Sequence, residues 1–172
     1  FAFAYNNRGW EKGQLSDTQG ALLDYNRAIA IDPEYAAAWN NRGVLRFNMD
    51  DKKGAFADNA QALRIAPRYA DAITNRGYYK DLSGNKQGAL LDYNLALTIE
   101  PRNFFALNNR GALKSSLGDT RGAILDFTEA LAIREYVLGF INRGKLLQAI
   151  GSKAAACSDY RNAERVAGKE LL

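Results

Sequence analysis

The chain has 172 residues and a formal net charge of +4; 47% of its residues are hydrophobic and 24% are charged. This composition is typical of a folded protein and excludes a disordered one. No apolar run approaches the roughly 18 residues that a membrane-spanning helix needs, so we expect no transmembrane segment. Because the chain begins at Phe1 rather than Met, we expect a processed protein or an excerpt of a longer one.

The triplet Asn-Arg-Gly recurs five times along the chain. It stands at residues 7–9, 41–43, 75–77, 109–111 and 142–144, which gives three intervals of 34 residues and one of 33. A fixed period of this size is typical of arrays in which each unit buries its apolar face against the next. We therefore expect a single array without a second domain, with repeats at approximately 2–35, 36–69, 70–103, 104–136 and 137–172.

The second unit shows the elements that each repeat is expected to contain. Residues 36–48 have apolar side chains at helical spacing, and Asp51 is a residue type that begins helices. A second helix then runs to about Arg64, and Pro67 ends it. The turn before the second helix reads Ser-Asp, Gly-Asn, Gly-Asp and Gly-Ser in the other units, so we expect a helix, a short turn and an antiparallel helix throughout.

Small residues recur in columns where paired helices would cross closely. A glycine lies midway along each first helix, although a mid-helix glycine costs roughly 1 kcal/mol relative to alanine. Two alanines lie two turns apart in each second helix, at Ala21, Ala55, Ala89, Ala123 and Ala156 and at Ala28, Ala62, Ala96, Ala130 and Ala163. An aromatic column beside them, at Tyr25, Tyr93, Phe127 and Tyr160, is interrupted by Asn59.

This order of glycine, alanine, aromatic, alanine and proline, repeated every 34 residues, resembles the tetratricopeptide repeat (TPR) family. The resemblance covers the whole chain and implies an all-α fold, a right-handed α-solenoid of about five helix-turn-helix units with about ten antiparallel helices. The Asn-Arg-Gly triplet, together with Gly-Ala at the start of the second helix, resembles cyanobacterial and plastid TPR arrays. That narrower resemblance implies a cytoplasmic or a plastid or thylakoid-associated protein.

Five arginines stand where the TPR family usually has leucine, and each is matched by an aspartate in the second helix. The expected pairs are Arg8 with Asp24, Arg42 with Asp58, Arg76 with Asp92, Arg110 with Asp126, and Arg143 with Asp159. Bidentate bonds between guanidinium and carboxylate groups would satisfy charges close to the core. We interpret these residues as structural ion pairs, within a repeat or between neighbours; a functional anion site is the alternative.

The sequence offers little to support catalysis. It has no histidine and one cysteine, which removes the commonest general base and any thiolate-based metal site. Its acidic residues are spread along the repeats and suggest no convergent carboxylate pair. We therefore expect no enzyme, no catalytic residues, no metal and no cofactor. Cys157 replaces an apolar residue of the repeat and is expected to be a small core side chain.

The asparagine of each triplet is the main candidate for binding. First helices line the concave face of a TPR array, so the resemblance implies a row of Asn7, Asn41, Asn75, Asn109 and Asn142 along that face. A carboxamide can bond to both groups of a peptide unit, and resembling arrays capture extended peptides in this way. The alternative is that each amide bonds to the neighbouring first helix. The residues expected to flank the row are Asn6, Trp10, Asn40, Phe47, Tyr78 and Asn108.

These features predict a protein–protein interaction scaffold that binds an extended or helical partner segment in its concave groove. The alternatives are an assembly subunit of a larger complex, for instance a photosynthetic membrane complex with peripheral membrane association, and the recognition arm of a larger enzyme. The partner is expected to be a protein or peptide of unknown identity. Nucleic acid is disfavoured because the basic excess is small and is concentrated near the C-terminal end.

Overall fold

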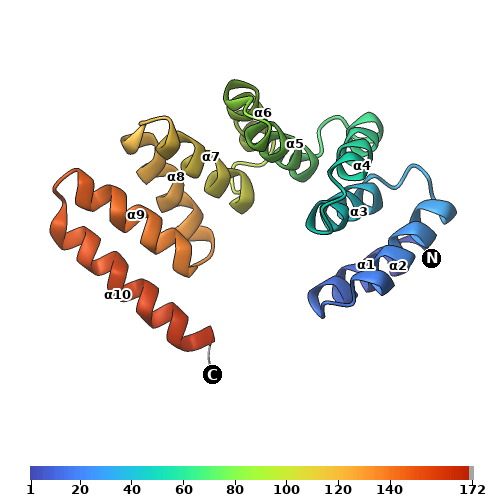
Figure 1. Cartoon of the computed structure of the whole chain (residues 1–172), viewed down its shortest axis with the longest axis horizontal. Coiled ribbons are helices and arrows are strands. Elements are labelled where there is room, and N and C mark those ends of the chain that lie inside the picture. Colours follow the sequence, from blue (N-terminus) through green and yellow to red (C-terminus); the bar gives the residue numbers. More distant parts are fainter. Residues whose placement is uncertain (171–172) are drawn as a thin grey trace. The chain divides into compact units, whose positions relative to one another are not determined.

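The computed structural model describes residues 1–170 and contains ten α-helices and no strand within them (Figure 1). The predicted all-α fold is therefore confirmed. In chain order the helices are α1 (Ala2–Gln14), α2 (Thr18–Ile31), α3 (Ala36–Asn48), α4 (Lys52–Ile65), α5 (Ala70–Leu82), α6 (Lys86–Ile99), α7 (Phe104–Ser116), α8 (Thr120–Ile133), α9 (Val137–Ala149) and α10 (Lys153–Glu170).

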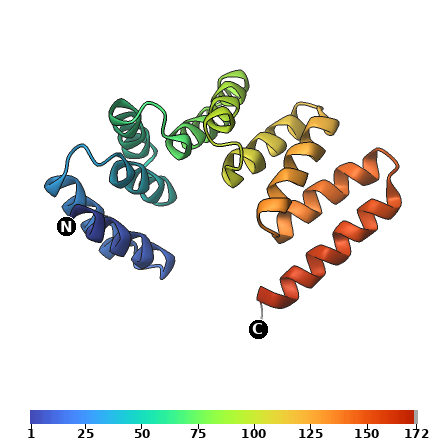
Figure 2. The same cartoon turned by 180° about the vertical axis from the view of Figure 1, so that it is seen from behind.

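The chain forms two compact units, residues 1–79 and the residues from Lys80 onward, and the division falls inside α5 rather than between repeats. The first unit contains the pairs α1–α2 and α3–α4 and most of α5. The second contains the end of α5, then α6 and the pairs α7–α8 and α9–α10. The two members of a pair, such as α9 and α10, lie side by side in both views (Figures 1 and 2).

Each second helix begins where the turn chemistry of the sequence predicts. The side chains of Asp17, Asp51, Asn85 and Asp119 each accept a hydrogen bond from the backbone N–H three residues later, at 2.9 Å. Such a cap satisfies one of the amide groups that the first turn of a helix leaves unpaired. The residue before the cap has a positive φ, 85° at Gly84 and Gly118. This backbone conformation explains why glycine recurs at the turn.

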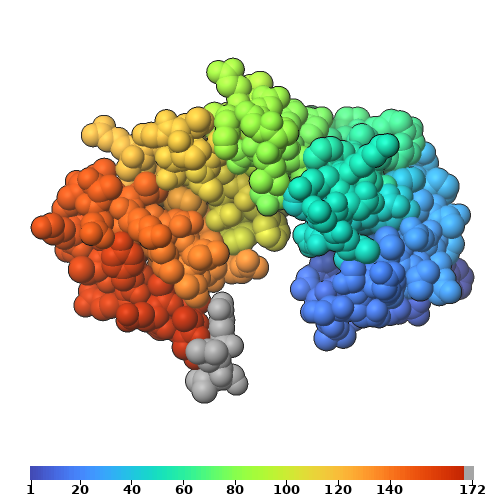
Figure 3. Space-filling view, in the orientation of Figure 1, coloured from blue at the N-terminus to red at the C-terminus, as the bar shows by residue number. Residues whose placement is uncertain are grey.

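The core of each repeat lies between its paired helices, where small side chains let the backbones approach. All eight alanines of the two columns in α2, α4, α6 and α8 are fully buried. A Cβ atom added to Gly9 would lie 2.9 Å from the ring of Tyr25, and one added to Gly144 would lie 2.9 Å from the ring of Tyr160. In the space-filling view, the atoms of paired helices such as α9 and α10, in orange and red, lie in direct contact (Figure 3).

Two positions in the second helices depart from the sequence interpretation. The prediction that Cys157 is a core side chain is wrong, because the structure places it in an exposed position. Its counterpart Phe56 packs against Tyr79 of the following first helix, and no helix follows α10 within residues 1–170. Asn59, which interrupts the aromatic column, is buried and donates a hydrogen bond to the carbonyl oxygen of Ala72 at 2.8 Å.

Candidate functional site

The structure brings arginine and aspartate together in four of the five predicted pairs. In the second repeat, Nε and Nη2 of Arg42 donate to the two carboxylate oxygens of Asp58 at 2.8 and 2.7 Å. The same two-bond geometry joins Arg8 to Asp24, Arg110 to Asp126, and Arg143 to Asp159. Arg76 and Asp92 belong to different compact units, and their pairing stays a prediction.

A second cation, one turn after the arginine, contacts the aspartate in four repeats, and in the first, second and fourth repeats it shares the carboxylate with the arginine. Lys12 lies 2.9 Å from Asp24, and the corresponding contacts are Arg46 with Asp58, Lys80 with Asp92, and Lys114 with Asp126. Hydrogen bonds from Arg8 and then Lys12 lower the pKa of Asp24 to about 2, against the opposing effect of burial. Asp24 therefore remains ionised over the whole neutral range, which suits a structural role better than proton transfer.

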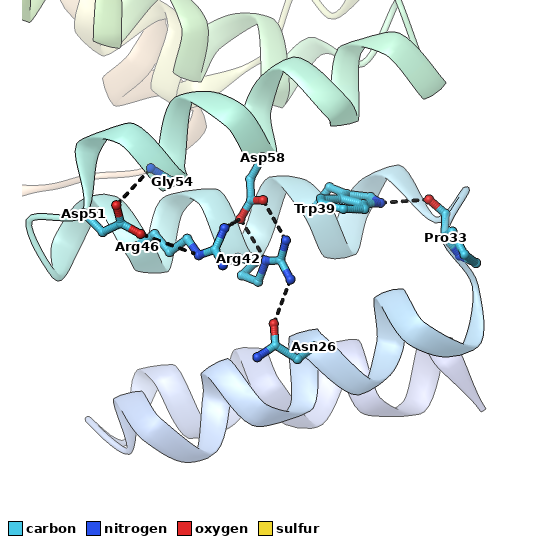
Figure 4. Close-up of polar contacts among 8 residues, drawn as sticks. All are labelled: Asn26, Pro33, Trp39, Arg42, Arg46, Asp51, Gly54 and Asp58. Carbon is cyan, nitrogen blue, oxygen red and sulfur yellow. Dashed lines mark hydrogen bonds and ion pairs between the residues drawn. The ribbon is translucent and has the colours of Figure 1, made fainter.

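The arginines also reach the preceding repeat, which the sequence interpretation missed. Nη1 of Arg42 donates to the side chain of Asn26 in α2 at 2.7 Å, as Figure 4 shows. The equivalent bonds in the second unit join Arg110 to Asn94 and Arg143 to Thr128. The signal in the sequence was the recurrence of an acceptor side chain 15 or 16 residues before the arginine. Each of these arginines thus fixes a first helix against two second helices.

The asparagine row joins neighbouring first helices in the first unit. Nδ2 of Asn41 donates to Oδ1 of Asn6 at 3.0 Å, and Nδ2 of Asn75 donates to Oδ1 of Asn40 at 2.8 Å. Asn6 and Asn40 are buried, so they lie inside the helix interface rather than on the surface expected for them. Asn7 is exposed at the start of the row.

The second unit arranges its amides differently. Nδ2 of Asn108 donates to Oδ1 of Asn109 within α7, at 3.1 Å. The hydroxyl of Tyr136 donates to Oδ1 of Asn108 at 2.6 Å, and burial raises the pKa of Tyr136 to about 12. This hydroxyl therefore stays protonated and remains a donor at all ordinary pH values. Asn142, in α9, is half-buried.

Aromatic side chains flank the row in the first unit. Trp10 and Tyr78 are 54% and 37% exposed, which leaves large apolar surfaces beside Asn7 and Asn75. Phe47 is half-buried; its ring stacks on Tyr79 at 4.9 Å and meets the edge of Tyr78 at 5.6 Å. The exposed face of the first helices in this unit thus alternates amides with aromatic rings, and we call it the amide–aromatic face.

Residues 1–170 contain no group of three or more histidine, cysteine, aspartate or glutamate side chains placed to hold a metal ion. None of their helices combines the length and the apolar character that a bilayer-spanning helix requires.

Comparison with known proteins identifies the fold. A family model described as a TPR repeat matches residues 11–50, and no curated protein matches the sequence. The structure of PilF from Pseudomonas aeruginosa is similar with a TM-score of 0.84 and 20% identity, over 95% of this chain and 75% of that one. A thermophilic TPR protein of Thermus thermophilus is similar with a TM-score of 0.81 and 19% identity, over 99% and 94%. The first TPR domain of Spaghetti (RPAP3), bound to an HSP90 peptide, is similar with a TM-score of 0.60 and 23% identity, over 68% and 93%. The chain thus has the all-α TPR solenoid fold of about five units.

Proposed function

We propose that this TPR fold serves as a non-enzymatic interaction scaffold whose amide–aromatic face binds an extended or helical segment of a partner protein. The observation that carries the proposal is the pair of amides, Asn41 and Asn75, held in place by the preceding first helix beside half-exposed aromatic rings. Fixed polar groups next to apolar surface are what recognition of a peptide backbone and its side chains requires.

The hydrogen bonds within the row leave bonding capacity for a partner. A carboxamide has two N–H groups and one carbonyl oxygen that accepts up to two bonds. Asn41 and Asn75 each use one N–H in the bond to the preceding helix. Each therefore retains its oxygen and one N–H for a peptide unit. Because those bonds already restrict the rotamers of the two asparagine side chains, these side chains lose less conformational entropy on binding a partner than free amides would.

The aromatic residues supply the apolar part of the face. Trp10 and Tyr78 combine a large ring with a polar N–H or O–H group, a combination that is enriched in protein interfaces. Lys12 lies on α1 with Trp10, and Arg46 lies on α3 with Asn41; they share their carboxylates with Arg8 and Arg42. Each such cluster keeps a net charge of about +1, and we expect the bound segment to contain apolar residues with few basic ones.

The comparisons support this function through the fold. The TPR domain of Spaghetti (RPAP3) is described as bound to an HSP90 peptide, so a protein of this fold and similar structure holds a peptide. Its identity to this chain is 23%, and the partner of this chain is accordingly argued from its own residues.

A cross-linking experiment tests the proposal. A photoreactive amino acid is placed at Trp10 or at Tyr78, and as a control at Leu23 or at Leu125, which are exposed on second helices. We expect the two first-helix positions to capture one and the same partner and the controls to capture none of it. The double variant Trp10→Ala/Tyr78→Ala should then bind that partner at least about tenfold more weakly, since aromatic anchors carry much of an interface's energy. Capture at the control positions alone would contradict the proposal.

A second candidate function is supported by a specific observation on the second helices. Leu23, Leu91 and Leu125 occupy equivalent positions and are 59, 70 and 64% exposed. Exposed leucines at a repeating position suit docking into a larger assembly. The resemblance of the Asn-Arg-Gly triplet to cyanobacterial and plastid arrays favours a photosynthetic complex, with a plastid or thylakoid location, as that assembly. Capture of a single partner from Leu23 and Leu125 would support this second function.

A further inference from the structure

The solvent-facing side of α8, in the second compact unit, carries a leucine between two opposite charges. Leu125 is 64% exposed, while other sides of α8 pack against α7 and α9. Arg121 precedes Leu125 by one turn and Glu129 follows it by one turn, and both are exposed. Side chains four residues apart lie on the same side of a helix. Arg121, Leu125 and Glu129 therefore form one line along α8, which we call the α8 stripe.

The two charges of the α8 stripe have no partner within residues 1–170. No ion pair or side-chain hydrogen bond joins Arg121 or Glu129 to another residue of this described part. The remaining charge of α8, Asp126, is buried and bound by Arg110 and Lys114. The exposed side of the helix thus holds one positive and one negative group, placed symmetrically about an apolar centre.

We propose that the α8 stripe binds a second copy of this chain, with the two α8 helices antiparallel and a two-fold axis at Leu125. In such a dimer the same surface serves on both copies, and each residue lies opposite the one equally far beyond Leu125. Arg121 of each copy then meets Glu129 of the other, and the two Leu125 side chains meet each other. Gly122 lies opposite Thr128, and these small residues let the helix axes approach to about 8–10 Å.

The charges specify both the orientation and the helix. Parallel α8 helices would place Arg121 against Arg121 and Glu129 against Glu129, and like charges are unfavourable at an interface. At the equivalent positions, α2, α4, α6 and α10 hold Gln-Leu-Arg, Lys-Ala-Gln, Gln-Leu-Leu and Ala-Ser-Asn. None of these triplets combines both signs of charge with a central leucine. Recognition of its own copy is therefore specific to α8 among the second helices.

The size of the contact sets the expected strength of the dimer. Helix α8 has 14 residues, so it is about 21 Å long. One pair of helices of this length buries less than the roughly 1,600 Å² of a standard protein interface. We therefore expect a weak dimer that forms at roughly 0.1–1 mM chain. The larger assembly proposed for the exposed leucines would be a different occupant, so the test uses the purified chain alone.

Disulfide trapping tests the position of the two-fold axis. Leu125→Cys in a Cys157→Ser background provides a single thiol, since Cys157 is the only cysteine. A residue on the axis meets its own copy, within the Cα separation of about 7 Å that a disulfide permits. The matched control is Ala132→Cys, exposed on the same side of α8. It lies about 10 Å along the helix from the axis, so its two copies are about 20 Å apart. Covalent dimer should form at least about tenfold faster with Leu125→Cys than with Ala132→Cys.

Charge reversal then tests the register. In the Leu125→Cys background, Arg121→Glu alone or Glu129→Arg alone places like charges opposite each other at two symmetric sites, and should slow trapping at least about tenfold. The double variant Arg121→Glu/Glu129→Arg restores opposite charges, and its trapping rate should return to within about threefold of the parent rate.

Sedimentation equilibrium of the chain with Leu125 and Cys157 retained provides a measurement free of the new cysteine. A reversible monomer–dimer equilibrium should appear by about 1 mM, and Arg121→Glu should shift it toward monomer. A chain that stays monomeric at that concentration would overturn the proposal. So would equal trapping of Leu125→Cys and Ala132→Cys, or trapping that ignores both charge reversals. None of the substituted residues belongs to the amide–aromatic face, so these results are independent of that face and its partner.

Discussion

The substitution Arg42→Met, set beside Arg8→Met, tests how burial changes the energy of the same ion pair. Both arginines make two bonds to an aspartate that is almost fully buried, and both aspartates keep a second cation. The side chain of Arg42 is 11% exposed and that of Arg8 is 52% exposed. Arg42 also bonds to Asn26 and lies over the ring of Trp39 at 4.7 Å. Methionine keeps much of the aliphatic volume, so the comparison isolates the guanidinium.

The expected costs follow from what each substitution leaves behind. Removing one partner of a buried pair costs about 3–5 kcal/mol, and we expect the lower end for Arg42→Met because Asp58 keeps Arg46. An exposed pair is worth about 1 kcal/mol or less, so Arg8→Met should cost roughly 1 kcal/mol. The double variant Arg42→Met/Asp58→Leu should be more stable than Arg42→Met alone, because it leaves no buried carboxylate short of a partner.

Tryptophan fluorescence during urea unfolding is the assay, because the two tryptophans, Trp10 and Trp39, both lie in the first compact unit. The signal therefore reports the unit that contains both substitutions. The midpoint and slope of the transition give the free energy of unfolding for each variant. If Arg42→Met and Arg8→Met cost the same within about 0.5 kcal/mol, burial does not set the energy of these pairs and the reasoning is wrong.

Three further predictions concern the core and the charges. The lowered pKa of Asp24 contributes about 2 kcal/mol of stability that is present above about pH 4 and is lost as the pH falls toward 2. Urea unfolding between pH 2 and 5 should show this loss. The Asp24→Asn variant should show a weaker dependence of the unfolding free energy on pH. In thermal unfolding, Gly144→Ala should destabilise the chain by about 1–3 kcal/mol because the new methyl group meets the ring of Tyr160. The control Gly13→Ala makes only an ordinary contact with Ala21. It should be neutral or should stabilise the chain by up to about 1 kcal/mol. Asn59→Ala should cost about 1–3 kcal/mol in urea unfolding because the carbonyl of Ala72 loses its buried side-chain donor; an unchanged midpoint would show that water replaces that donor.

The sequence by itself determined the repeating elements, because local chemistry fixes them. The glycine and alanine columns, the capping residues such as Asp51 and the helix-ending Pro67 each act within one repeat, and the structure has a helix-turn-helix unit at each copy. The aspartate partner of Arg42 was likewise predictable, since the pair recurs at one fixed spacing. The exposure of Cys157 was not, because the pattern of a repeat says nothing about whether another helix covers it.

Only the tertiary structure decided what the polar side chains of the repeat do, because hydrogen bonds between repeats depend on how neighbouring helices are placed. The sequence allowed Asn41 either to face a ligand or to join the neighbouring first helix; the structure shows the bond to Asn6 and the bonding capacity that remains. It also shows that Arg42 reaches Asn26 of the preceding repeat, and that Arg8 has no such acceptor among the described residues. Equivalent residues of similar repeats thus differ in exposure and in bonding because their neighbours differ.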